Sequence, residues 1–180
     1  MEIENISFMS AFNSTKDIGG EYNRLISKID DEWIFIKDGD SLFLTPDYGD
    51  RISKIIDSNQ RFDVIGAITN RIAVDSLRST VDILCEPDMD KHIRTSNELW
   101  SKNGTMVTET KDTVAAFCMF FRREVWEKSK FKENSIVFDR EFCKDAIDNG
   151  FKIGIAQGLY LFHLYRWRQK NPKYYTNHLI

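Results

Sequence analysis

The sequence predicts an α/β fold, namely a single domain with a mixed, mostly parallel sheet that is flanked by helices in a Rossmann-like arrangement. The first seventy residues alternate between short apolar runs and stretches with helical spacing of apolar residues, in the order β-α-β-α-β, which is typical of parallel sheets. A length of 180 residues fits one domain, taken as 1–180. Hydrophobic residues make up 42% and charged residues 29%, as in ordinary globular proteins.

The N-terminal part is expected to start with a strand at residues 6–12, followed by a polar turn and a helix that begins near Asp17, a favourable N-cap. Apolar residues fall on one face of this helix, at Ile18, Tyr22, Leu25, Ile26 and Ile29. Residues 33–37 form the second strand. A second helix follows Pro46, since proline suits a helix start, and residues 64–69 form the third strand.

The second half is less regular. Residues 70–113 are polar and indicate only one helix. The expected elements are, in order, that helix around 91–100, a strand at 114–122, helices at 124–130 and 139–149, and strands at 151–155 and 159–165. Gly150 would end the last helix.

Charge and cysteine content limit the class of protein. The net charge of −3 provides no basic field, so a nucleic-acid partner is not expected. The three cysteines, Cys85, Cys118 and Cys143, are odd in number and lack metal-ligand spacing, which favours free thiols in a reducing cytoplasm. Residues 1–5 do not resemble a signal peptide, and no apolar run reaches the ~18 residues of a membrane span.

Two carboxylates stand out because they follow a buried strand. Asp38 and Asp40, separated by a glycine, come directly after the apolar run at 33–36. Ligands of open α/β sheets bind beyond the carboxyl ends of strands, and oxygen ligands suit a divalent cation. The same spacing at Asp88 and Asp90 follows a polar stretch and is interpreted as a solvated turn. An acidic turn without a ligand remains the alternative for the first pair.

The order of several motifs resembles the glycosyltransferases of the type A fold, in particular the small inverting enzymes that contain an Asp-X-Asp motif. The resemblance covers residue 6 to about residue 167. The segments that carry it are Phe-Met-Ser-Ala-Phe-Asn-Ser-Thr-Lys from residue 8, Ile-Lys-Asp-Gly-Asp from 36, the apolar strand and Trp-containing helix at 117–130, Phe-Asp-Arg-Glu-Phe from 138, and Leu-Tyr-Leu-Phe-His-Leu-Tyr-Arg from 159.

This resemblance implies a metal site. It places Asp38 near the nucleotide ribose and the metal, Asp40 on the metal, and His163 as a third ligand, with Mn²⁺ or Mg²⁺ bound against the diphosphate of a UDP- or GDP-linked sugar. A core histidine is the alternative for His163. His92 and His178 are expected at the surface.

The resemblance also implies donor-binding residues. Ser10 and Phe12 correspond to positions that hold the nucleobase, although both could simply pack in the strand, and Lys16 could approach a phosphate or the base. Arg166 could reach the diphosphate if the last strand bends, or could be a solvated strand-end residue. Independently of the family, Arg71 follows the third strand and could bind phosphate or acceptor, or pair with a nearby aspartate.

The general base is implied at Asp139, with Glu141 as a rival and a helix cap as a compatible structural role. The chain lacks the Glu-Asp pair that is usual at this point, and it leaves little sequence for binding an acceptor. Residues 168–180 form a possible C-terminal tail. The basic, aromatic segment 165–175 could pack over the nucleotide site, touch a membrane surface peripherally or form a homo-oligomer contact.

The predicted function is therefore a metal-dependent, inverting glycosyltransferase that moves a sugar from a nucleotide-diphosphate donor to a glycan, lipid-linked or protein acceptor. A nucleotidyl or phosphoryl transferase could use the same carboxylates, but Gly19-Gly20 is not part of a phosphate-binding loop motif. A catalytically silent glycan-binding or assembly subunit is the non-enzymatic alternative.

Overall fold

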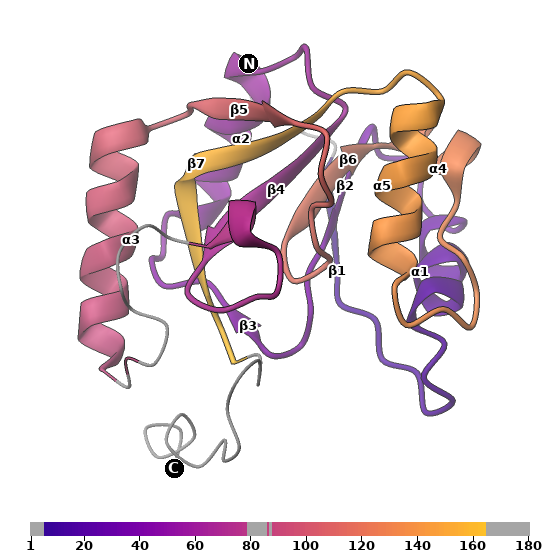
Figure 1. The fold of residues 1–180 in the computed structure, drawn as a ribbon, viewed down its shortest axis with the longest axis horizontal. Coiled ribbons are helices and arrows are strands. Elements are labelled where there is room, and N and C mark those ends of the chain that lie inside the picture. The colour runs from indigo at the N-terminus through magenta and orange to yellow at the C-terminus, as the bar shows by residue number, and fades with distance from the viewer. Residues whose placement is uncertain (1–5, 79–85, 87, 165–180) are drawn as a thin grey trace.

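The computed structural model describes residues 6–78, 86 and 88–164, which form a mixed sheet with helices around it (Figure 1). Within these ranges the sheet has seven strands, and six follow the order β1-β2-β6-β4-β7-β3 while β5 pairs with β7. The strands are β1 (Ile6–Met9), β2 (Trp33–Ile36), β3 (Ser41–Leu42), β4 (Val64–Thr69), β5 (Val107–Thr110), β6 (Met119–Arg122) and β7 (Ile153–His163).

The expected α/β fold with a mixed, mostly parallel sheet is confirmed. The pairs β1–β2 and β4–β7 are parallel, and β6 joins them by antiparallel pairing to β2 and β4. Strands β1, β2, β4 and β7 consequently point the same way, whereas β3, β5 and β6 run against them. The carboxyl ends of four strands therefore meet at one edge of the sheet.

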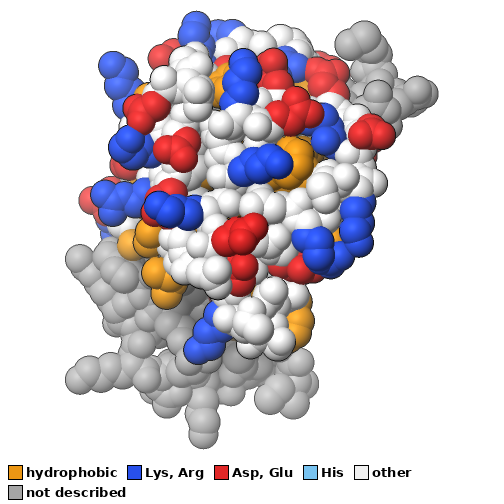
Figure 2. Space-filling view, turned by 90° about the vertical axis from the view of Figure 1, so that its right-hand side faces the viewer, with side chains coloured by type: hydrophobic (Ala, Val, Ile, Leu, Met, Phe, Trp, Pro, Cys, Tyr) orange, Lys and Arg blue, Asp and Glu red, His pale blue; other side chains and the backbone are white. Residues whose placement is uncertain are grey.

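The helices are α1 (Ile18–Ile26), α2 (Tyr48–Ser58), α3 (Met89–Asn103), α4 (Arg123–Ser129) and α5 (Phe138–Asp148), with a short 3-10 helix η1 at Asp75–Leu77. In Figure 1, α3 lies beside β7 at the left, and α2 lies behind the sheet. Helices α1, α4 and α5 are grouped at the right of the view, opposite α3. The face of this group carries cations and anions interspersed (Figure 2). The pairs Arg24–Glu21 and Lys144–Asp148 are examples.

The core explains why the central strands read as continuous apolar runs. Every residue of β2 and β4 is buried, because helices and loops cover both faces of the sheet. Asp17 caps α1 as expected, since its Oδ1 accepts the Gly20 N–H at 2.9 Å, and the same oxygen accepts the Asn134 N–H at 2.8 Å. In the described residues no helix is long and apolar enough to cross a membrane.

The expected strand at 114–122 is too long. Only Met119–Arg122 pairs as a strand, and residues 114–118 form a buried turn in which the Cys118 N–H bonds to the Ala115 carbonyl at 3.3 Å. Apolar composition predicted the burial of this segment correctly, but burial does not specify hydrogen-bond pairing. Cys118 and Cys143 are buried free thiols, as expected, and Cys85 lies outside the described residues.

The two expected C-terminal strands are one strand, β7. It continues through Gln157 and Gly158. Its pairing with β4 is irregular there, because the register shifts between Ala67 and Ile68 of β4. Gly158 is needed for packing, because a Cβ there would collide with the carbonyl oxygen of Gly104, which follows α3.

The segment with Asp88 and Asp90 is not a solvated turn but the start of α3. The Asp88 carboxylate accepts the Asp90 N–H at 2.9 Å and caps the helix. The helix itself is longer than predicted. Strands β3 and β5 were not predicted, and both are short and polar.

Candidate functional site

The acidic turn after β2 is fixed by its neighbours. The Lys37 N–H bonds to the Met9 carbonyl at 3.0 Å, which keeps the ends of β1 and β2 side by side. The Lys37 ammonium donates to the carbonyls of Asp38 (2.8 Å) and Ser41 (2.6 Å) and so spans the turn. The Lys37 side chain thereby fixes the backbone of the turn that carries Asp38 and Asp40.

The turn then packs against the end of β7. Ser41 in β3 pairs with His163, and the Leu164 N–H donates to the Asp40 carbonyl at 3.0 Å. The Ser41 hydroxyl, which is fully buried, donates to the Phe117 carbonyl at 2.7 Å. Two segments more than 120 residues apart in the sequence are thereby brought together.

Asp38, Asp40 and His163 form one cluster, in which a ligand atom of each lies within 4.8 Å of the others. His163 Nε2 lies 3.3 Å from Asp40 Oδ1. His163 Nδ1 lies 3.1 Å from the Arg71 carbonyl oxygen, which can only accept, so Nδ1 carries a hydrogen and Nε2 faces the carboxylates. Carboxylates suit Mg²⁺ and Mn²⁺, and an imidazole is a common ligand of first-row transition metals. Within the described ranges no other group of three such residues has this spacing.

The two carboxylates differ electrostatically. Burial, together with the charge of Asp40, raises the pKa of Asp38 to about 6. The neighbouring His163 imidazole holds the pKa of Asp40 below its usual value. Two carboxylates held close at a partly buried edge repel one another, and a divalent cation would relieve this repulsion.

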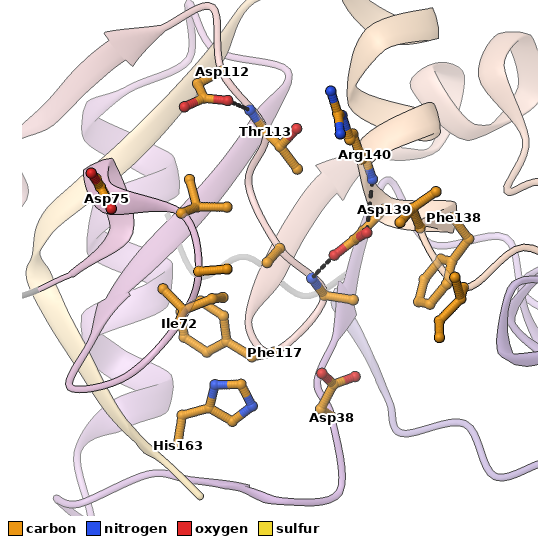
Figure 3. Close-up of a pocket in the computed structure, with 16 residues that line it drawn as sticks. Asp38, Ile72, Asp75, Asp112, Thr113, Phe117, Phe138, Asp139, Arg140 and His163 are labelled. Atoms are coloured by element: carbon orange, nitrogen blue, oxygen red, sulfur yellow. Dashed lines mark hydrogen bonds between the residues drawn. The ribbon is translucent and has the colours of Figure 1, made fainter. Parts of the chain in front are cut away.

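A cavity of about 680 Å³ opens beside the cluster (Figure 3). Asp38 and His163 line one end, Asp139 and Arg140 enter from α5, and Ile72 and Phe117 provide apolar wall. A second cavity of about 530 Å³ adjoins it along α5 and shares some of its lining, including Arg140.

Asp139 is not the cap of α5. The helix begins at Phe138, Val137 occupies the N-cap position, and Asp139 lies in the first turn with its carboxylate at the cavity. Its Oδ2 accepts the Ala116 N–H at 3.2 Å and its Oδ1 the Arg140 N–H at 2.8 Å (Figure 3). Burial raises the pKa of Asp139. Glu141, the rival, pairs with Lys132 at 3.4 Å and lines the second cavity instead.

The expected nucleobase residues lie in the loop after β1. Ser10, Phe12 and Lys16 are exposed, Phe12 to 86%, and none of them lines the cavity. Lys16 adopts a left-handed backbone with φ 68°. The loop leaves the same edge of the sheet as the acidic turn but does not contribute to the cluster.

Arg71 is fully buried, and its Nη2 donates to the Leu164 carbonyl at 2.6 Å. It therefore braces the end of β7 from behind the cluster and presents no surface to a phosphate or acceptor. Arg166, His178 and the tail at 168–180 lie outside the described residues.

His92 is buried, so its expected surface position is wrong. Its Nδ1 lies 2.7 Å from the Tyr160 hydroxyl and its Nε2 lies 2.9 Å from the Glu86 carbonyl. Because that carbonyl accepts, Nε2 donates and Nδ1 accepts from Tyr160. The helical spacing of α3 did not mark this face as buried, since its other buried residues, Thr95 and Ser96, are polar.

Several residues that shape the site were not predicted. Phe117 stacks on the His163 ring with centroids 5.2 Å apart, and Asn70 accepts the His163 N–H at 2.8 Å. The position of Asn70 directly after β4, at the same edge of the sheet, could have indicated that it belongs to the site. The position of Phe117 could not, because it lies in the segment expected to be a strand.

No family model and no curated protein matches the sequence. The solved structures that are similar in fold include the following two. The mannosyltransferase PcManGT from Pyrobaculum calidifontis, solved in complex with GDP-Man and Mn²⁺, aligns with a TM-score of 0.53 and 11% identity over 85% of this chain. The alignment covers 38% of that protein, so this chain spans about two fifths of its length. A197 from STIV aligns with a TM-score of 0.50 and 13% identity, covering 88% of this chain and 84% of that one. At these identities the likeness concerns the fold, and the fold resembles that of a glycosyltransferase.

Proposed function

We propose that this protein is a metal-dependent, inverting glycosyltransferase that uses a nucleotide-diphosphate sugar as donor. The observation that carries the proposal is the cluster of Asp38, Asp40 and His163 at the carboxyl edge of the sheet, beside a cavity that also contains Asp139. The GDP-Man and Mn²⁺ bound by the mannosyltransferase of similar fold are consistent with this donor and metal.

Asp38, Asp40 and His163 are the residues that would hold Mn²⁺ or Mg²⁺. The bound cation would act as a Lewis acid for the charge that develops on the departing nucleoside diphosphate. His163 is oriented for this role because the Arg71 carbonyl fixes the hydrogen on Nδ1. The Lys37 ammonium keeps the carboxylates in place through the backbone of the turn.

Asp139 is the proposed general base. Its carboxylate reaches the cavity from α5, whereas Asp38 and His163 reach it from the turn after β2 and the end of β7. An acceptor hydroxyl and a leaving diphosphate can therefore occupy different sides of the sugar. The N–H groups of Ala116 and Arg140 fix the orientation of the carboxylate. The raised pKa makes it a better proton acceptor than an exposed aspartate.

The nucleotide is proposed to bind in the loop after β1. Phe12 offers an exposed ring for stacking on the base, Ser10 a hydroxyl, and Lys16 a cation for a phosphate. Arg166, three residues beyond the end of β7 and outside the described residues, is proposed as a further contact to the diphosphate.

The test is a thermal-shift panel of nucleotide-sugars with and without Mn²⁺, followed by a transfer assay with the donor that binds. We expect Asp40→Ala to lose Mn²⁺-dependent binding of the nucleoside diphosphate while the protein stays folded. Asp90→Ala is the matched control, because Asp90 has the same Asp-X-Asp spacing at the start of α3. Equal behaviour of the two variants, or a wild type that binds no nucleotide with Mn²⁺, would contradict the proposal.

A further inference from the structure

Asn70 stands where β4 ends and touches the candidate ligand His163 rather than the cavity. Its side chain is buried, with 3% of the residue exposed, and its Oδ1 accepts the His163 main-chain N–H at 2.8 Å. The parallel pairing of β4 with β7 ends at Thr69 and Leu161. The side-chain amide of Asn70 thus extends the hydrogen bonding between the strands to His163, after the main chain of β4 has turned away.

The same turn supplies the second contact. Because the chain leaves the strand at Asn70, the Arg71 carbonyl is directed at the imidazole and accepts from Nδ1 at 3.1 Å. The main chain and the ring of His163 are therefore both held by adjacent residues of the β4 end. On the opposite side, Leu164 and Ser41 tie the acidic turn to β7.

Only half of the Asn70 amide is satisfied. In the part of the chain that the structure describes, its Nδ2 is buried without a hydrogen-bond partner, while its Oδ1 accepts from His163 and from the Thr69 hydroxyl at 3.1 Å. A buried unpaired donor is unfavourable, and the site uses the oxygen alone. This arrangement indicates that the role of Asn70 depends on the hydrogen bonds that its side-chain oxygen accepts.

We propose that Asn70 is a positioning residue for the metal site, which sets the place of His163 so that Nε2 faces Asp38 and Asp40. The inference rests on the proposed function, since it assigns a role at the same cluster. Residues that orient metal ligands typically change metal affinity by about 10–100-fold when they are replaced. The effect is transmitted through His163 alone, because Asn70 is neither in the cavity lining nor in the cluster.

The test compares Mn²⁺ affinity, measured by electron paramagnetic resonance, in wild type and three variants. Asn70→Leu removes the acceptor and, with it, the unpaired donor, and we expect a loss of about 10–100-fold. Asn70→Asp keeps the acceptor oxygen, and we expect it to retain the wild-type affinity or exceed it. Asn103→Leu is the matched control, because Asn103 donates to the Gln157 carbonyl of the same strand β7 at 2.9 Å, away from the cluster.

A second readout uses the unmodified protein and does not need the metal. Long-range ¹H–¹⁵N NMR of metal-free wild type at pH 8.5 should show a hydrogen on His163 Nδ1, and a hydrogen on Nε2 alone would overturn the proposal. Unchanged Mn²⁺ affinity in Asn70→Leu, or an equal loss in Asn103→Leu, would overturn it as well. If wild type binds no Mn²⁺, the proposed function fails. The positioning role then stands only if Asn70→Leu shifts the His163 signals and Asn103→Leu does not.

Discussion

Replacing Asp38 by Asn should make the metal-free protein more stable. Asp38 is ionised at neutral pH in the unfolded chain, but in the folded protein its carboxylate is partly buried and lies beside the charge of Asp40. The turn is held by the backbone carbonyl of Asp38, which accepts from Lys37 and Ser41, and Asn leaves these bonds intact. The substitution therefore removes an unfavourable charge and little else.

The magnitude follows from the pKa. A rise from 3.8 in the unfolded chain to about 6 in the folded protein corresponds to about 3 kcal/mol of unfolding free energy at pH 8. For a chain of 180 residues this is a rise of about 6–12 °C in Tm.

The stabilisation by Asp38→Asn should increase with pH. A carboxyl group whose pKa is raised by folding destabilises the protein above that pKa, and the penalty fades as the pH falls toward the unfolded value. The difference in unfolding free energy between Asp38→Asn and wild type should therefore be greatest above pH 7, and about 1 kcal/mol at pH 4.5. Urea denaturation with EDTA present, at both pH values, measures it.

Asp30→Asn is the control, because Asp30 is an exposed carboxylate in a loop and should give no comparable gain. In the presence of Mn²⁺ the order should reverse, since wild type gains stability from the bound cation and Asp38→Asn loses a ligand. An Asp38→Asn protein that is less stable than wild type without metal at pH 8 would refute the electrostatic reasoning.

Three further predictions follow from other parts of the structure. Asp139→Asn should keep donor affinity, since Asn can still accept the Ala116 N–H, but should lower transfer by about 10²–10⁴ in a steady-state assay; full activity would move the base elsewhere. Burial lowers the pKa of His92, so the unfolded chain takes up a proton below about pH 6.5 that the folded protein does not. Between pH 7.5 and 5.5 wild type should therefore lose more unfolding free energy, measured in urea, than His92→Gln; parallel pH dependences of the two would contradict this. Gly158→Ala should lower the unfolding free energy by about 1–3 kcal/mol or more, because a methyl group there meets the Gly104 backbone; unchanged urea midpoints would contradict the packing.

The sequence predicted structure best where a single local signal determines it, such as an apolar run or a helix cap. The apolar run of β2 predicted a strand buried on both faces, and the carboxylates that follow it were correctly expected at the edge of the sheet. Asp17 was recognised as a cap because the helix signal is local. His163 was placed beside the carboxylates from a family resemblance, and the register of β3 with β7 brings it there.

Sequence reasoning failed where distant contacts decide the structure. Two strands, at 151–155 and 159–165, were expected where the structure has one, and the approach of Gly104 explains why Gly158 within it is a glycine. For Arg71 the sequence allowed a contact with a phosphate or acceptor or an ion pair with an aspartate, whereas in the structure it is buried and donates to the Leu164 carbonyl. Asn70 could not be assigned to His163 without the pairing of β4 with β7. The local periodicity of apolar residues carries no information about these contacts.

We propose that Asp38, Asp40 and His163 bind a divalent cation together with a nucleoside diphosphate. Crystals grown with MnCl₂ and GDP, measured near the manganese absorption edge, test this binding directly. We expect an anomalous peak between the two carboxylates and His163 Nε2, with the diphosphate bound to it. A manganese peak elsewhere, or nucleotide bound with no peak at the cluster, would contradict it.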